Sequence, residues 1–128
     1  LWIAMRHPDL FASAGSMSGA VDINMPKFHN RWKIKQWLGT YESAPQIWKT
    51  HTVMSLVPSL SPGTLRFIVA CGDKDIFIGV NNNLHKLLTS RGIDHVYSVT
   101  PGNHSWVYWR QTLPMILDFL SETFVTYD

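Results

Sequence analysis

The sequence feature that most constrains the fold is an apolar run over residues 65–71, in which Arg66 is the only charged side chain. A polar turn, Gly-Asp-Lys-Asp, follows directly at residues 72–75. A strand that is apolar on both faces must be covered on both faces, and this pattern is typical of central strands in parallel sheets. The run therefore predicts a buried parallel strand whose exit loop carries carboxylates.

The other elements alternate between strand and helix patterns. Residues 11–18 are small and uncharged, as expected of a second buried strand, and residues 95–99 predict a third. Helical spacing of apolar residues predicts an amphipathic helix over residues 79–90 and a final helix over about 106–124. This order predicts an α/β fold, with a mostly parallel sheet, right-handed crossovers and helices on both faces.

Residues 23–63 mix basic, aromatic and turn residues and fit neither pattern. We interpret them as an insertion between two strands, with short helices around residues 31–38 and 44–56. No repeat or linker divides the chain, so residues 1–128 are predicted to form a single domain. The chain begins without Met, within a helical pattern at residues 1–6, and we expect this domain to be incomplete, without its N-terminal strands.

The composition excludes several classes of partner. With 45% hydrophobic and 16% charged residues, the chain is predicted to form a compact soluble domain. A net charge of +2 is too small to indicate nucleic acid or an anionic membrane surface. Cys71 is the only cysteine, and no apolar run approaches the roughly 20 residues that cross a bilayer. We expect neither nucleic acid nor membrane as a partner, and the compartment, cytoplasmic or secreted, stays open.

Two ionisable residues follow neighbouring predicted strands. Asp75 comes just after the run at 65–71, and His104 comes just after the strand at 95–99. In open parallel sheets the chemistry lies at the carboxyl ends of the strands. In a hydrolase triad an acid orients an imidazole, which takes the proton of a nucleophile. Acid before histidine is the order of α/β-hydrolases, whose serine comes earlier in the chain.

Four segments of the chain carry a more specific signal: residues 5–12 (MRHPDLFA), 18–22 (SGAVD), 71–75 (CGDKD) and 101–109 (PGNHSWVYW). They resemble the esterase D, S-formylglutathione hydrolase and antigen 85-type esterases over nearly the whole chain. The last segment is the most specific, since this family reads Pro-Gly-Gly-His followed by Trp-x-x-Trp, with Asn103 here replacing the second glycine. The resemblance implies the C-terminal part of an α/β-hydrolase fold. It also implies hydrolysis of small or carbohydrate-linked esters or thioesters through an acyl-enzyme, without a metal or an organic cofactor.

By this resemblance Asp75 is the triad acid and His104 the general base. Asp73 is the rival acid, two residues away. The family pattern places its aspartate immediately before an apolar pair, here Ile76 and Phe77, which favours Asp75. The alternative is an ordinary turn or helix-capping carboxylate beside a surface histidine.

The resemblance also implies a Gly-x-Ser-x-Gly nucleophile elbow, and no serine of this chain fits that pattern. Ser18, for example, has Ser16 two residues before it and Ala20 two residues after it. Because the segment ending in His-Pro-Asp follows the elbow in this family, the serine is expected within about ten residues before Leu1, with the oxyanion hole also upstream. The chain alone is therefore expected to be inactive.

The substrate pocket is less strongly marked. Trp106 follows His104 closely, and the residues 23–63 carry Trp32, Trp37 and Trp48, which are candidates for an acyl or alcohol pocket. The other histidines share no spacing typical of metal ligands.

Two further functions stay open at this stage. The first is acyl transfer to a sugar or another alcohol. The second is a non-catalytic protein, which is either a degenerate hydrolase used for binding or a chain that begins at Leu1. A chain of the latter kind would expose a long apolar sheet edge and so favour aggregation or oligomerisation.

Overall fold

A parallel three-stranded sheet organises the chain, as the computed structural model shows for residues 1–124. Its strands are β1 (Ser13–Met17), β2 (Arg66–Gly72) and β3 (His95–Thr100), in the order β1-β2-β3. Beyond Arg66 every residue of β2 is buried. The predicted parallel sheet with its central apolar strand is confirmed.

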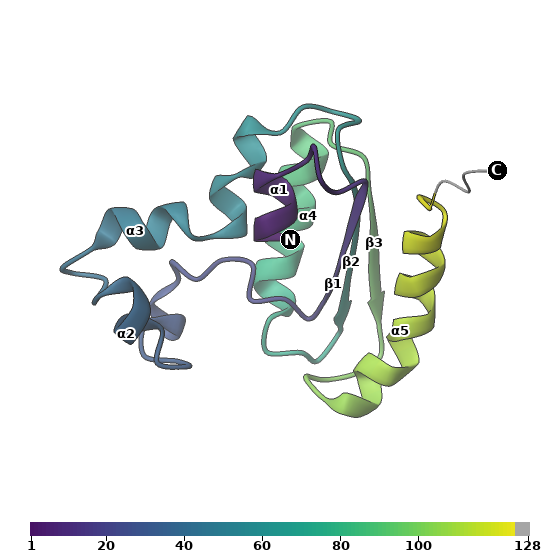
Figure 1. Cartoon of the computed structure of the whole chain (residues 1–128). Coiled ribbons are helices and arrows are strands. Elements are labelled where there is room, and N and C mark those ends of the chain that lie inside the picture. The colour runs from purple at the N-terminus through teal and green to yellow at the C-terminus, as the bar shows by residue number, and fades with distance from the viewer. Residues whose placement is uncertain (125–128) are drawn as a thin grey trace.

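Helices cover both faces of this sheet. Figure 1 shows α1 (Trp2–Arg6) and α4 (Ile78–Ser90) on one side and α5 (Trp106–Ser121) on the other. The bounds of α4 agree with the amphipathic pattern, and α5 ends three residues before the predicted boundary at 124. This layering explains why β2 is apolar on both faces, because each face of the strand packs against a helix.

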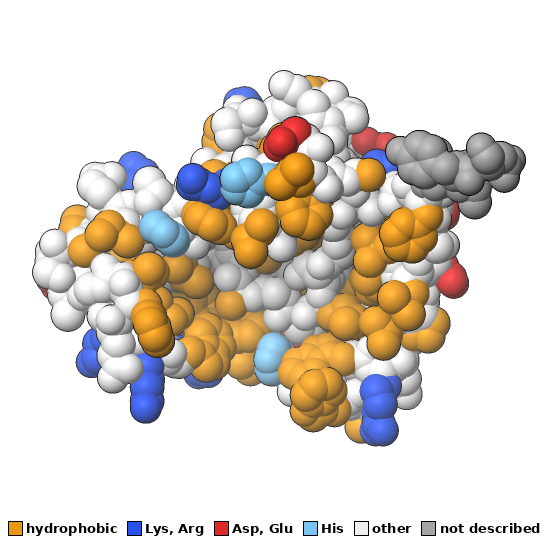
Figure 2. Space-filling view, in the orientation of Figure 1, with side chains coloured by type: hydrophobic (Ala, Val, Ile, Leu, Met, Phe, Trp, Pro, Cys, Tyr) orange, Lys and Arg blue, Asp and Glu red, His pale blue; other side chains and the backbone are white. Residues whose placement is uncertain are grey.

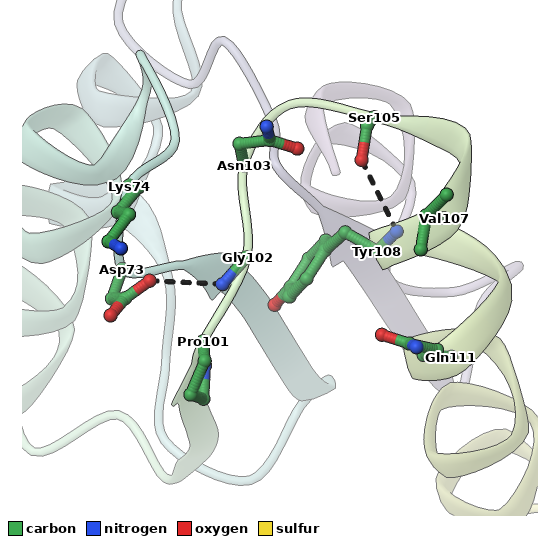
Figure 3. Close-up of a pocket in the computed structure, with 9 residues that line it drawn as sticks. All are labelled: Asp73, Lys74, Pro101, Gly102, Asn103, Ser105, Val107, Tyr108 and Gln111. Atoms are coloured by element: carbon green, nitrogen blue, oxygen red, sulfur yellow. Dashed lines mark hydrogen bonds between the residues drawn. The ribbon is translucent and has the colours of Figure 1, made fainter.

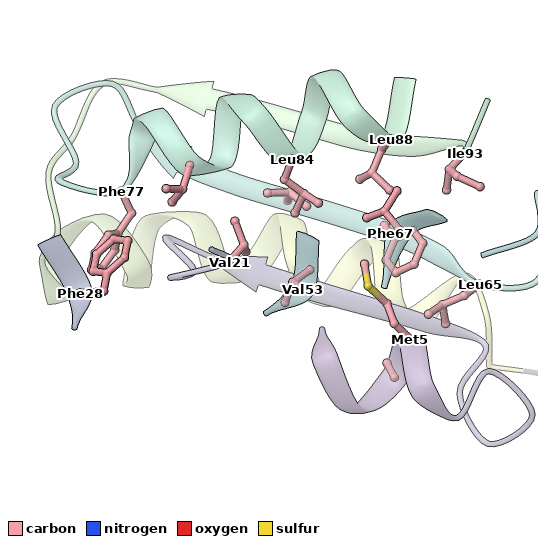
Figure 4. Packing of buried hydrophobic residues seen from close by; sticks show 14 residues of the cluster. Met5, Val21, Phe28, Val53, Leu65, Phe67, Phe77, Leu84, Leu88 and Ile93 are labelled. Carbon is pink, nitrogen blue, oxygen red and sulfur yellow. The ribbon is translucent and has the colours of Figure 1, made fainter. Parts of the chain in front are cut away.

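The side chains of β2 alternate between two hydrophobic cores. Phe67 and Val69 point into the larger core, where they meet Leu84 and Leu88 of α4 (Figure 4). Ile68 and Ala70 point the other way, into a smaller core beneath α5. The period of two along a strand produces this division, so the central strand joins the two helical layers.

Residues 23–63 fold into short helical pieces, which stand out from the sheet on the side of α1 and α4 in Figure 1. The pieces are η1 (Pro26–Phe28), α2 (Ile34–Leu38), α3 (Pro45–Thr50), η2 (Val53–Ser55) and η3 (Val57–Ser59). The single helix predicted over 44–56 is wrong, because α3 ends at Thr50. Thr52 is buried in an extended conformation, and its hydroxyl donates to the Val21 carbonyl oxygen at 2.8 Å. This contact with a distant segment outweighs local helical spacing.

Within residues 1–124, no helix combines the length and the apolar character that a bilayer span requires.

The larger core supports a first prediction. Replacing the fully buried Leu84 by Ala should lower the free energy of unfolding by about 2–5 kcal/mol, because the lost contacts leave a cavity between α4 and β2. Leu117→Ala on the exposed side of α5 is the matched control and should cost much less. Urea denaturation followed by circular dichroism measures both. Equal losses for the two variants would contradict the packing described.

Candidate active site

The loop between β2 and α4, residues 73–77, is called the acid loop and holds one buried carboxylate. The Asp75 side chain has no exposed surface, and its Oδ1 accepts the backbone N–H of Phe77 at 2.8 Å. The Asp75 amide donates to the Gly72 carbonyl, and the Ile78 amide donates to the Asp75 carbonyl. This tight turn fixes the carboxylate in one orientation at the start of α4.

The loop between β3 and α5, residues 101–105, is called the histidine loop and leaves the sheet at the same edge as the acid loop. β3 ends at Thr100, and His104 lies two residues before α5, which is capped by the Ser105 hydroxyl. His104 Nδ1 lies 3.2 Å from Asp75 Oδ1 and 3.1 Å from Oδ2. Because a carboxylate only accepts hydrogen bonds, this contact assigns the proton of the neutral ring to Nδ1 and leaves the lone pair of Nε2 free.

Aromatic rings hold the imidazole from two sides. Phe77 and Trp109 each meet His104 edge to face, with ring centroids 4.8 Å apart in both cases. The His104 side chain is 32% exposed, so part of the ring stays open to solvent while its partner Asp75 is closed off. Figure 2 shows hydrophobic side chains gathered on the side where the strands end in Figure 1. The ring is thus packed in place yet accessible.

Two glycines allow the acid loop and the histidine loop to approach each other. A Cβ atom on Gly72 would collide with the Gly102 carbonyl, and one on Gly102 would collide with the Tyr108 ring. Both glycines belong to the sequence motifs, but Gly72 meets a residue of the other loop and Gly102 meets a ring six residues later in its own segment. The motifs contain these glycines and Trp109, but the close approach of the two loops and the contact of Phe77 with the imidazole appear only in the folded structure.

The two candidate acids point in different directions. Asp75 contacts His104, whereas Asp73 is exposed and accepts the Gly102 amide at 3.0 Å. Asp73 faces an open groove of about 530 Å³, which Figure 3 shows between the acid loop and the first turns of α5. The residues lining that groove include neither Asp75 nor His104. The structure therefore brings Asp75, and not Asp73, to the imidazole.

The candidate pocket tryptophans lie in different surroundings. Trp106 is 75% exposed and packs on Trp109, which itself contacts His104. Trp32 is 54% exposed and packs against Phe77 at 5.6 Å between ring centroids. These two indoles lie at opposite ends of an aromatic chain through His104. Trp32 also has a left-handed backbone, φ 51°, which is uncommon for a residue other than glycine.

The other two tryptophans do not join this aromatic chain among the described contacts. Trp37 is 85% exposed on α2, away from any ring contact in residues 1–124, and its place in a pocket stays a prediction. Trp48 is fully buried and donates its indole N–H to the Gly39 carbonyl at 2.9 Å. The expectation that Trp48 lines a pocket is wrong, because this side chain anchors residues 39–48 instead.

Ser18 and Cys71, whose side chains carry a hydroxyl and a thiol, are both buried. Burial, followed by the nearby Asp75 carboxylate, raises the pKa of the Cys71 thiol to about 12, so the thiol stays protonated and a poor nucleophile at neutral pH. Within residues 1–124 no group of three or more His, Cys, Asp or Glu side chains could hold a metal ion.

A family model described as "Putative esterase" matches residues 1–120. The chain belongs to this esterase family. The acetyl esterase of Caldicellulosiruptor saccharolyticus is 30% identical over 57 residues, which make up 44% of this chain and 21% of that protein.

Solved structures show the fold that this esterase-family chain shares. A ferulic acid esterase matches with a TM-score of 0.73 and 20% identity, over 94% of this chain and 46% of its own. The S-formylglutathione hydrolase of Staphylococcus aureus matches with a TM-score of 0.76 and 16% identity, over 93% of this chain and 48% of its own. The chain therefore has part of an α/β-hydrolase fold and spans about half the length of these two structures.

The raised pKa of Cys71 gives a second prediction. Iodoacetamide at pH 8 should leave Cys71 of the native protein unmodified, because below a pKa of about 12 the thiol is protonated and the strand excludes the reagent. Unfolding in guanidinium should expose the thiol and restore labelling. Mass spectrometry of the peptide that contains Cys71 measures both states. Native labelling at the rate of the unfolded chain would contradict this environment.

Proposed function

We propose that the protein containing this chain is a carboxylic ester hydrolase of the serine α/β-hydrolase type, with Asp75 as triad acid and His104 as general base. The observation that carries the proposal is the contact between His104 Nδ1 and the buried Asp75 carboxylate at adjacent strand ends. The same contact in a surface turn would have little consequence. Here it occurs in a chain of an esterase family, with the second ring nitrogen left free.

The geometry suits His104 to move a proton at Nε2. In the proposed reaction a serine outside this chain gives its hydroxyl proton to Nε2 and attacks the ester carbonyl carbon. The tetrahedral intermediate collapses, the carbon–oxygen bond to the alcohol breaks, and the alcohol leaves with the proton from Nε2. Water, deprotonated by the same nitrogen, then attacks the acyl-enzyme, which releases the acid and restores the serine. No metal or organic cofactor enters these steps, and the chain without its serine is inactive.

Asp75 stabilises the imidazolium that forms in each half-reaction. Its carboxylate is excluded from water, so its attraction for a positive ring is less screened than that of a surface carboxylate. The Phe77 amide fixes Oδ1, and the carboxylate therefore does not have to reorient as the charge appears. The same contact selects the tautomer in which Nε2 can accept a proton.

Trp106 and Trp32 support a substrate surface on either side of His104. Both present large exposed indoles that connect to the imidazole through one further ring, Trp109 or Phe77. Exposed indoles offer flat apolar faces to an acyl group or to the alcohol part of an ester. We propose small or carbohydrate-linked esters or thioesters as the substrates. The relatives carry names of this range: an acetyl esterase, a ferulic acid esterase and an S-formylglutathione hydrolase.

The triad assignment predicts that His104→Ala and Asp75→Asn each lower kcat for 4-nitrophenyl acetate by at least about three orders of magnitude in the full-length protein. The first variant removes the base, and the second removes the charge that holds the ring. His7→Ala, at an exposed histidine, is the matched control and should keep the wild-type rate. Turnover of either triad variant at the wild-type rate, with folding intact, would refute the proposal.

The aromatic surface gives a separate prediction. Trp106→Ala should lower kcat/KM for an aryl ester by about tenfold, because the substrate loses a flat apolar contact. Trp106→Phe keeps an aromatic face and should recover most of that loss. Steady-state kinetics of the full-length protein decide the matter. An unchanged kcat/KM in the alanine variant would remove Trp106 from the substrate surface.

A further inference from the structure

Asp73 is a charged side chain of the acid loop that the proposed reaction leaves without a role. It lies two residues before Asp75, and its Oδ1 accepts the backbone N–H of Gly102 at 3.0 Å. Gly102 in turn lies two residues before His104. One hydrogen bond therefore joins the segment that carries the acid to the segment that carries the base.

Two backbone hydrogen bonds accompany this contact. The Asp73 amide donates to the Thr100 carbonyl at 3.0 Å, and the Lys74 amide donates to the Gly102 carbonyl at 2.9 Å. The paired strands β2 and β3 end at Gly72 and Thr100, so these bonds continue the ladder into the two loops. The Gly102 amide has no backbone acceptor among the contacts of residues 1–124, and the Asp73 carboxylate fills that place.

Steric contacts limit the motion of the histidine loop in other directions. The Gly102 carbonyl lies against Gly72, and Gly102 itself lies against the Tyr108 ring. Figure 3 shows Gly102 between Asp73 and Tyr108, beside the open groove. Packing alone would thus let the loop move outward into the groove. The hydrogen bond from the Gly102 amide to Asp73 Oδ1 opposes that motion.

We propose that Asp73 is a positioning residue, whose carboxylate anchors the Gly102 amide and so keeps His104 in register with Asp75. This inference rests on the proposed function, since its consequence is a correctly placed base. It assigns different roles to two carboxylates two residues apart: Asp75 contacts the imidazole, and Asp73 holds the loop that presents it. The required property of Asp73 is a side-chain oxygen at the right place, rather than negative charge alone.

The test compares Asp73→Ala, which removes the acceptor, with Asp73→Asn, which keeps an acceptor oxygen but loses the charge. In the full-length protein Asp73→Ala should lower kcat by about tenfold, the effect of losing one hydrogen bond, with little change in KM. Asp73→Asn should recover most of this loss with an unshifted pH profile. Asp94→Ala, an exposed carboxylate at the opposite end of β3, is the matched control and should match the wild type.

A second readout does not depend on turnover. The Gly102 amide should exchange with solvent faster in Asp73→Ala than in the wild type or in Asp73→Asn, as measured by amide hydrogen exchange in NMR spectra. An active wild type with unchanged kcat and unchanged Gly102 exchange in Asp73→Ala would overturn the inference.

Other outcomes of the same experiments would also overturn the positioning role of Asp73 or the proposed function. Equal losses in both variants, with the acidic limb of the pH profile moved to lower pH, would assign a charge role instead and overturn the positioning role. Abolished turnover in both, with Asp75→Asn still active, would make Asp73 the acid. A wild-type protein without esterase activity would refute the proposed function itself, a result separate from any effect of Asp73.

Discussion

The parallel pairing of β2 with β3 is the constraint on which the candidate site depends. Gly72 lies opposite Thr100 in the register, so both strands end at the same edge of the sheet. The acid loop and the histidine loop must therefore leave the sheet side by side. Asp75 contacts His104 within a few residues of the end of each strand. A one-residue slip would reverse the alternation of side chains along the strand and move both loops. Such a slip would exchange Phe67 and Val69 of the larger core with Ile68 and Ala70 of the smaller core, and the packing of both cores opposes it.

The burial of Asp75 has an energetic cost that the geometry of the site offsets. A carboxylate without exposed surface is destabilising unless hydrogen bonds replace the water that it loses. Here the Phe77 amide and His104 Nδ1 supply those bonds. The pair is asymmetric, since the acid is enclosed while the imidazole remains partly open. This asymmetry suits a group that holds its partner in place and a partner that exchanges protons with a substrate.

Local patterns predicted the sheet because its central strand β2 is apolar along nearly its whole length and buried beyond Arg66, whereas β1 and β3 are only partly buried. The apolar run at residues 65–71 and the amphipathic spacing at 79–90 correspond to the regular elements β2 and α4. The helix expected over 44–56 failed because Thr52 bonds to Val21, a residue far back in the chain. Trp48 was misplaced for a similar reason, since its side chain is fully buried and its indole N–H donates to the Gly39 carbonyl. Where a tertiary partner decides the conformation, spacing alone is insufficient.

The distinction between local sequence patterns and tertiary contacts also applies within the candidate site. The motifs carried Asp75 and His104, and the family resemblance favoured Asp75 over Asp73. The separate contacts of the two carboxylates, one with the imidazole and one with the Gly102 amide, appear only when the two loops are folded together. The flanking rings of Phe77 and Trp109 likewise come from different segments.

The most direct test of this account is the tautomeric state of His104 in the full-length protein, measured by long-range proton–nitrogen NMR correlation at a pH where the ring is neutral. The account predicts a single Nδ1–H tautomer, with its proton protected from solvent in the wild type and losing that protection in Asp75→Ala. An Nε2–H tautomer, or the rapidly exchanging mixture typical of a surface histidine, would contradict it.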